Sequence, residues 1–148
     1  MKRISLSLLA ILTIGLAYGQ DQSVTYKITN YSVNGVNYDD LALNSDVAIS
    51  FYMCDNTTMC FANLWRNTGS QSYGGVYALK SKEIPETPST FGGEEYKFTW
   101  KFLNTYDDKK GEAAVTFTKS LIGNTVKIRA EILVLNTNEV LVLDGYQE

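Results

Sequence analysis

The sequence predicts an all-β fold, an antiparallel up-and-down meander of eight or nine strands that closes into a barrel. Short segments of alternating apolar and polar residues follow one another along the chain, and turn signals separate them. Consecutive hairpins of this kind form either a closed barrel or a β-sandwich. The strands are long, and the glycine pair at positions 74–75 suits a sharp bend, so we favour the barrel.

The central element is a predicted hairpin between residues 96–102 and residues 113–119. Alternate side chains of a strand point to opposite faces, so one face of the first segment carries only aromatic rings. These rings belong to Tyr96, Phe98, Trp100 and Phe102. Residues 107–111 (Asp-Asp-Lys-Lys-Gly) have the composition of a short turn. The hairpin therefore predicts one buried face and one solvated face, and other strands must cover the first.

The remaining strands are predicted from the same alternation. They cover residues 24–33, 47–53, 59–66, 73–79, 126–134 and 140–143. Asn34-Gly35 is the strongest local hairpin signal, because both residues tolerate the positive φ angles of a type I′ turn. Residues 39–44 suit either a short helical turn or a loop. Residues 81–93 contain both prolines and predict a long connection.

The N-terminus has the three parts of a secretory signal peptide over residues 1–19. Lys2 and Arg3 precede an apolar run that is shorter than the ~20 residues of a membrane span. Ala17 and Gly19 then provide the small residues of a cleavage site. A membrane anchor is the rival interpretation. We expect a secreted or periplasmic protein without a stable membrane span after cleavage, whose single barrel domain covers residues 20–148.

Composition and the two cysteines restrict the function further. The formal net charge of −3 gives no electrostatic case for binding nucleic acid or an anionic membrane.

An exported protein meets an oxidising compartment, so Cys54 and Cys60 predict a disulfide. In a hairpin whose loop is residues 55–59, the two cysteines face each other. A redox-active pair is the rival, but the spacing is not that of a CxxC motif.

The chain resembles the small exported lipocalin-like, calycin-type barrel proteins of bacteria. The signal peptide, the meander of strands and the segment Trp100–Gly111 carry this resemblance. The Gly-x-Trp sequence that lipocalins have on their first strand is absent between Val24 and Val33. The resemblance implies a closed barrel whose interior has room for a ligand.

Catalytic chemistry has few candidates in this sequence. The chain contains no histidine, which removes the commonest general base and the commonest transition-metal ligand. The paired carboxylates at positions 39–40, 94–95 and 107–108 are the remaining candidates for hydrolysis or calcium binding. Neighbours on a strand point to opposite faces and Asp is an ordinary turn residue, so we favour a structural role for them. We therefore expect no catalytic residues, no metal and no cofactor.

A ligand site is expected on the aromatic inner faces. The predicted lining is Asn63, Trp65, Tyr77, Tyr96, Phe98, Trp100 and Phe102. In a hollow barrel these residues would hold a small apolar or aromatic ligand, with Asn63 as a polar group. In a filled barrel they would form plain core, and the domain would act through its surface on a protein partner that the sequence does not identify. A carboxylate-based hydrolase is the third class.

Overall fold

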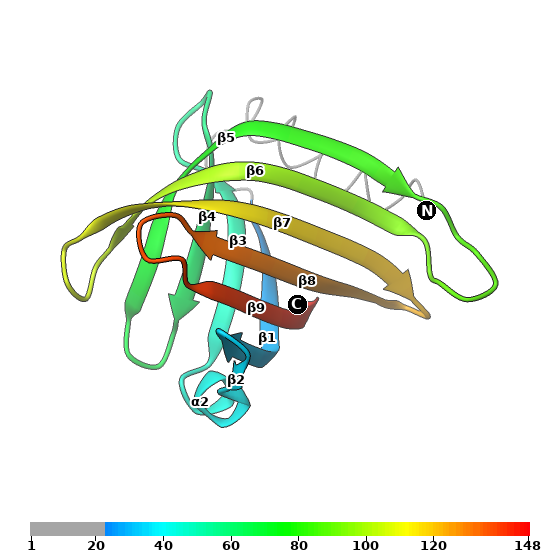
Figure 1. Cartoon of the computed structure of the whole chain (residues 1–148), viewed down its shortest axis with the longest axis horizontal. Helices are drawn as coiled ribbons and strands as arrows, with labels where there is room; N and C mark the ends of the chain where they lie inside the picture. Colours follow the sequence, from blue (N-terminus) through cyan, green and yellow to red (C-terminus); the bar gives the residue numbers. More distant parts are fainter. Residues whose placement is uncertain (1–22) are drawn as a thin grey trace.

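The computed structural model describes residues 23–148, which form nine strands and one short helix (Figure 1). The elements are β1 (Ser23–Val33), β2 (Val36–Asn37), α2 (Asp39–Asn44), β3 (Val47–Met53), β4 (Met59–Trp65), β5 (Ser70–Ile84), β6 (Gly93–Asn104), β7 (Lys110–Ile122), β8 (Thr125–Val134) and β9 (Val140–Gln147). The all-β prediction is confirmed. The predicted signal peptide lies outside the described residues. Within residues 23–148, no helix has the length and apolar character needed to cross a membrane.

The strands are antiparallel and follow the order of the chain. From β3 to β9 each strand pairs with the next, and β1 pairs with both β3 and β9, so eight strands of the described chain close a barrel. The short β2 adds to the edge of β1. This arrangement confirms the closed barrel over the sandwich.

Strand β1 closes the barrel by changing neighbours along its length. Its first half pairs with β3, whereas its second half pairs with β9 (Figure 1). A β-bulge interrupts the β9 pairing between Ile28 and Asn30. Before the bulge Tyr26 and Ile28 face inward, and after it Tyr31 rather than Asn30 is buried. Because of the extra residue, even-numbered side chains face inward before the bulge and the odd-numbered Tyr31 faces inward after it.

Two predicted hairpins are confirmed, although the connection between β6 and β7 is residues 105–109 rather than 107–111. Trp100 pairs with Ala113, and the aromatic face of β6 covers the interior. The first hairpin turns at Asn34 and Gly35, whose φ angles of 51° and 81° match the type I′ preference. Residues 39–44, which were open between helix and loop, form the helix α2.

Strand β5 differs from the prediction in length. It continues to Ile84 and pairs with the start of β6, so residues 81–84 are strand and the connection is limited to residues 85–92. β5 pairs with β4 only through Gly75, and beyond that point it follows β6 alone among the described strands. The strand therefore belongs to two parts of the barrel wall, and the glycine pair lies where they meet.

The predicted facing of β5 is wrong at Tyr77. Gly74 pairs with the inward residues Phe61 and Phe102, so the even-numbered positions of this part of the strand face inward. Tyr77 is 47% exposed, and its ring lies outside the barrel, 5.0 Å from the Nζ atom of Lys101. A Cβ atom at Gly74 would clash with the backbone carbonyl of Lys101. The inward positions 72 and 74 of β5 carry the small residues Ser and Gly, and at position 74 the backbone of Lys101 leaves no room for a side chain.

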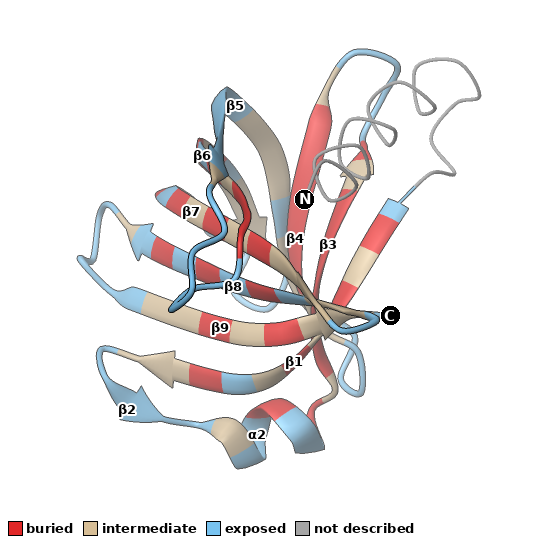
Figure 2. Ribbon diagram, turned by 90° about the vertical axis from the view of Figure 1, so that its right-hand side faces the viewer, coloured by how far each residue is buried: buried red, intermediate tan, exposed pale blue. Residues whose placement is uncertain are grey.

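Burial alternates along β6, β7, β8 and β9, as the red bands in Figure 2 show. One half of the barrel is filled by a cluster of rings whose centroids lie 4.9–5.9 Å apart. The rings belong to Tyr26, Phe51, Phe61, Phe98 and Phe117. Edge-to-face and tilted contacts of this kind add to the energy of burying the rings.

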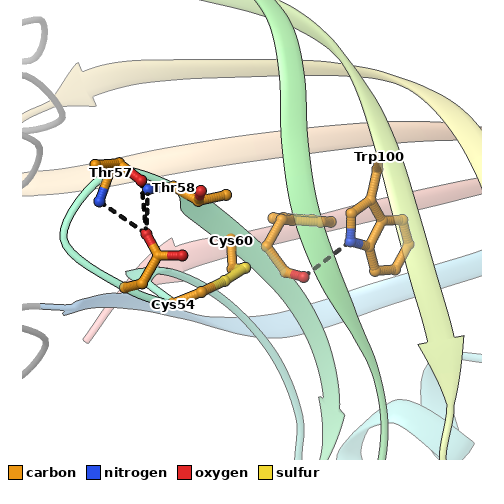
Figure 3. The surroundings of a disulfide bond; sticks show 7 residues. Cys54, Thr57, Thr58, Cys60 and Trp100 are labelled. Carbon is orange, nitrogen blue, oxygen red and sulfur yellow. Dashed lines mark hydrogen bonds between the residues drawn. A yellow bond between two sulfur atoms is a disulfide. The ribbon is translucent and has the colours of Figure 1, made fainter.

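The disulfide between Cys54 and Cys60 is confirmed, and it joins the ends of the β3–β4 loop (Figure 3). Its geometry differs from the prediction, because Cys60 pairs with Tyr52 rather than with Cys54. The amide of Cys54 instead donates to the carbonyl of Thr58, so the bridge is diagonal, with a Cα–Cα distance of 5.7 Å. The Asp55 carboxylate accepts hydrogen bonds from the amides of Thr57 and Thr58, which tightens the loop to three residues, 55–57.

Candidate functional site

A cavity of about 640 Å³ lies at the end of the barrel opposite the disulfide. The turns after β4, β6 and β8 surround its mouth, at the left and lower left of Figure 1. Its deeper lining comes from strand positions that face inward. These are Tyr31, Asn63, Trp65, Ser72, Trp100, Phe102, Asn104, Gly111, Ile132, Val134 and Leu141. The barrel is therefore packed in one half and hollow in the other.

Trp100 separates the two halves. Its side chain is almost completely buried, and one edge packs against Phe61 of the filled half with a centroid distance of 5.0 Å. Its indole N–H donates to the Phe61 carbonyl oxygen (Figure 3). On the cavity side its ring lies 4.5 Å from that of Phe102 at an interplanar angle of 33°. The floor of the cavity is thus a pair of rings whose positions are set by the core below.

Asn63 provides a polar group inside the cavity. The residue is only 7% exposed, and its Oδ1 atom has no hydrogen-bond partner among the described residues. The other side of the carboxamide interacts with the hydroxyl of Tyr31, whose pKa burial raises to about 12 while the hydrogen bond from Asn63 opposes the shift. The Tyr31 ring also packs edge-to-face on Trp65. One end of the buried carboxamide is therefore hydrogen-bonded to Tyr31, and the Oδ1 atom at the other end has no partner among the described residues.

Asp39 holds the bulged part of β1 in place. Its carboxylate accepts a hydrogen bond of 2.8 Å from the backbone N–H of Tyr31 and a second from the side chain of Asn30. These hydrogen bonds lower the pKa of Asp39, so the carboxylate is ionised at neutral pH. The first residue of α2 thus fixes the segment that turns Tyr31 into the cavity.

Two further polar side chains lie on the part of the cavity wall that β5 and β6 form. The Ser72 hydroxyl donates to the Asn104 Oδ1 atom over 2.6 Å. Near them, partial burial raises the pKa of Tyr106, whose ring lies at the mouth. The cavity therefore combines an aromatic floor with amide and hydroxyl groups on its walls.

The structure divides the seven predicted ligand-binding residues into three groups. Asn63, Trp65, Trp100 and Phe102 line the cavity. Tyr96 and Phe98 face inward but belong to the packed half of the barrel. Tyr77 lies on the outside, for the register reason given above.

Tyr31 is the main cavity residue that sequence reasoning missed. Strict alternation from Tyr26 and Ile28 places Asn30 inside and Tyr31 outside. The bulge reverses this order, and the local signal for it is a polar Asn at an expected inward position. Ser72 and Asn104 were missed because small polar residues carry no inward signal in an apolar pattern.

The predicted carboxylate pairs occupy separate parts of the barrel. Asp39 binds the β1 bulge, and Asp107 accepts from the amide of Lys109 in the β6–β7 turn. Glu94 is buried, whereas Glu95 lies near the exposed lysines 82 and 97. Among residues 23–148, no three acidic or cysteine side chains gather as metal ligands.

Searches against protein-family models, curated proteins and solved structures returned no significant match. The fold assignment therefore depends on the geometry described above. A closed antiparallel barrel of eight strands is compatible with the lipocalin-like fold that the resemblance implied.

Proposed function

We propose that this protein is an exported, non-catalytic β-barrel that binds a small apolar or aromatic ligand in the cavity at its mouth. The observation that carries the proposal is the division of one barrel into a packed half and a hollow half. A barrel that served only as a scaffold would gain stability from filling both halves, since empty apolar space loses packing contacts.

The size and chemistry of the cavity support a ligand of drug-like size. Its volume of about 640 Å³ falls within the range of roughly 300–1,000 Å³ that is typical of small-molecule pockets. Trp65, Trp100 and Phe102 provide apolar surfaces in the deeper part of the cavity, where Asn63, Ser72 and Asn104 add polar groups, whereas the charged lining residues lie in and beside the turns at the mouth. Such a lining suits an apolar or aromatic molecule that is oriented by one or two hydrogen bonds.

Export is the second part of the proposal. Its support is the disulfide Cys54–Cys60, which is typical of oxidising compartments, together with the N-terminal sequence pattern. Mass spectrometry of the protein from an exported fraction tests this part, because cleavage after Gly19 gives a chain that begins at Gln20.

Native mass spectrometry of gently purified protein, beside the same sample denatured, tests for a carried ligand. Titration with N-phenyl-1-naphthylamine, an uncharged aromatic probe that fluoresces in apolar surroundings, tests binding directly. The variant Ser72→Trp places an indole in the cavity, and Thr116→Trp places the same group on the outer face of β7.

We expect saturable probe binding that Ser72→Trp abolishes and Thr116→Trp leaves unchanged. A bare chain mass together with no probe binding contradicts the proposal. That result favours the alternative, a structural or interaction domain that acts through its surface. Turnover of a glycoside substrate would instead support a carboxylate-based hydrolase.

A further inference from the structure

The Asn63 carboxamide is a distinctive polar group of the cavity. Four buried polar side-chain atoms lack hydrogen-bond partners among the described residues, on Tyr26, Asn63, Lys119 and Gln147. Asn63 is the one of these four that lines the cavity. Its Oδ1 atom is an acceptor, and burying an acceptor without a partner is unfavourable because the atom loses its hydrogen bonds to water.

The orientation of this acceptor is set by its neighbours. Asn63 lies on β4 between Ile49 of β3 and Ser72 of β5, so the backbone on both sides is held in the sheet. The side chain is restrained by Tyr31, which is itself held by Asp39 and packed on Trp65. An acceptor that is fixed before binding loses little conformational entropy when a ligand arrives.

The surfaces beside the acceptor favour a planar molecule. Trp65 stands on the same face of β4, two residues along the strand from Asn63. Trp100 and Phe102 form the floor, where their ring centroids lie 4.5 Å apart and the ring planes are tilted by 33°. A planar aromatic ligand can cover these rings while its edge meets the carboxamide.

We propose that the cavity selects uncharged aromatic ligands that carry an N–H or O–H donor at the edge of the ring, and that Asn63 Oδ1 accepts this donor. The inference rests on the proposed function and names its ligand class. The oxygen is buried without a partner in the free protein, so a ligand that carries a donor pairs it, whereas a ligand without a donor leaves it unpaired. Purely apolar ligands are therefore disfavoured.

The test compares two probes that differ at the donor. N-phenyl-1-naphthylamine has one N–H group, and its N-methyl derivative has none. Each is titrated into the wild type and into Asn63→Leu, which keeps a side chain of similar size and removes the acceptor. Asn63→Thr and Asn63→Val form a second matched pair, of equal shape, in which only Thr retains an oxygen.

In the wild type we expect the N–H probe to bind about 10-fold more tightly than the N-methyl probe, as the cost of an unpaired buried acceptor implies. In Asn63→Leu the ratio of the two dissociation constants should fall close to one. In Asn63→Thr the ratio should exceed that in Asn63→Val. Circular dichroism of each variant shows whether the barrel is folded.

Equal ratios in the wild type and in folded Asn63→Leu overturn the inference and leave the proposed function intact. If Asn63→Leu does not fold, the ratio in the wild type and the Thr and Val pair decide in its place. Failure of both probes to bind the wild type overturns the inference, and together with a bare chain mass it overturns the proposed function as well.

Discussion

The indole Nε1 atom of Trp100 donates a hydrogen bond of 2.9 Å to the backbone carbonyl oxygen of Phe61. Trp100 belongs to β6 and Phe61 to β4, and β5 lies between these two strands in the sheet. The bond therefore crosses the interior instead of following the barrel wall. It connects the floor of the cavity to the ring cluster that fills the other half.

Replacing Trp100 should cost stability in two steps. Trp100→Phe keeps an aromatic ring but leaves the Phe61 carbonyl without this donor, so we expect a loss of about 1–3 kcal/mol in the free energy of unfolding. Trp100→Ala also removes the buried ring, and the expected loss is about 3–5 kcal/mol. Urea denaturation measures both. A loss near zero for Trp100→Ala would show that this ring does not pack as described.

Gly74→Ala should destabilise the barrel, because the added Cβ meets the backbone carbonyl of Lys101 and backbone cannot move aside cheaply. We expect a loss of about 3 kcal/mol or more, at the upper end of overpacking effects. Gly123→Ala is the control. It meets open space at a φ of 64°, so only the conformational cost of about 1–2 kcal/mol applies. Equal losses in the two variants would refute the close approach of β5 and β6.

Asp39→Ala should weaken binding of the N-phenyl-1-naphthylamine probe several-fold. It removes the acceptor of the Tyr31 backbone N–H, and the bulge that turns Tyr31 into the cavity then loses its support. Asp40→Ala, one residue along, is the matched control and should leave the dissociation constant unchanged. Titration of both variants with the probe decides. An equal effect of the two substitutions would point to a general loss of negative charge.

Stability should rise with pH between about 8 and 10 through Lys119. This side chain is 1% exposed, its Nζ atom lacks a hydrogen-bond partner among the described residues, and it lies 5.9 Å from the Tyr96 ring centroid. Burial lowers the pKa of Lys119 from 10.5 to about 8, and the charge of Glu94 opposes the shift. Between these values the unfolded chain binds more protons than the folded chain, so raising the pH favours folding.

The expected gain is about 2 kcal/mol in the free energy of unfolding, measured by urea denaturation at pH 7 to 10. Above pH 10 the gain should reverse, because burial raises the pKa of Tyr26 and of Tyr31, and the unfolded tyrosines then ionise first. Lys119→Met should remove the rise between pH 8 and 10. A rise that persists in this variant would have to come from another group.

Reduction of Cys54–Cys60 should lower the melting temperature modestly and leave the barrel folded. The two residues are only six positions apart, and closing so small a loop contributes roughly 2 kcal/mol. Thermal melts followed by circular dichroism, with and without a reductant, measure the effect. Complete unfolding on reduction would mean that the bridge supports more than its own loop.

Local pattern was sufficient wherever the strands alternate without interruption. The inward face of β6 could be predicted because side chains along a strand alternate with a period of two. The pairing of Trp100 with Ala113 was not predicted, because the turn lies two residues earlier than its composition indicated. The Asn34-Gly35 turn was predictable because few residues other than these accept two successive positive φ angles. The cysteine pair was predictable from its spacing, although not its diagonal geometry.

Prediction of the inward residues failed in two situations. In one, a bulge changes which residues of a strand face inward, and in the other, a large aromatic residue faces solvent. Tyr77 is large and was expected inside, but β5 turns Gly74 inward, where the backbone of Lys101 leaves no room for a side chain, and Tyr77 therefore faces outward. Tyr31 was overlooked because one extra residue in β1 exchanges its face with that of Asn30. Both outcomes depend on partners far away in the sequence.

The sequence by itself determined an antiparallel meander of strands, the approximate positions of its turns and most of its aromatic inner face, because these follow from the period of two and from residues that are neighbours in the chain. Closure into a barrel depends on the pairing of β1 with β9, which are far apart in the sequence. Only the tertiary structure decided that Phe98 belongs to a packed half while Trp100 forms the floor of a cavity. Both residues lie on the same face of the same strand. The difference between them comes from what other strands place beside each residue: the rings of Phe51 and Phe61 pack against Phe98, whereas open space lies beside Trp100.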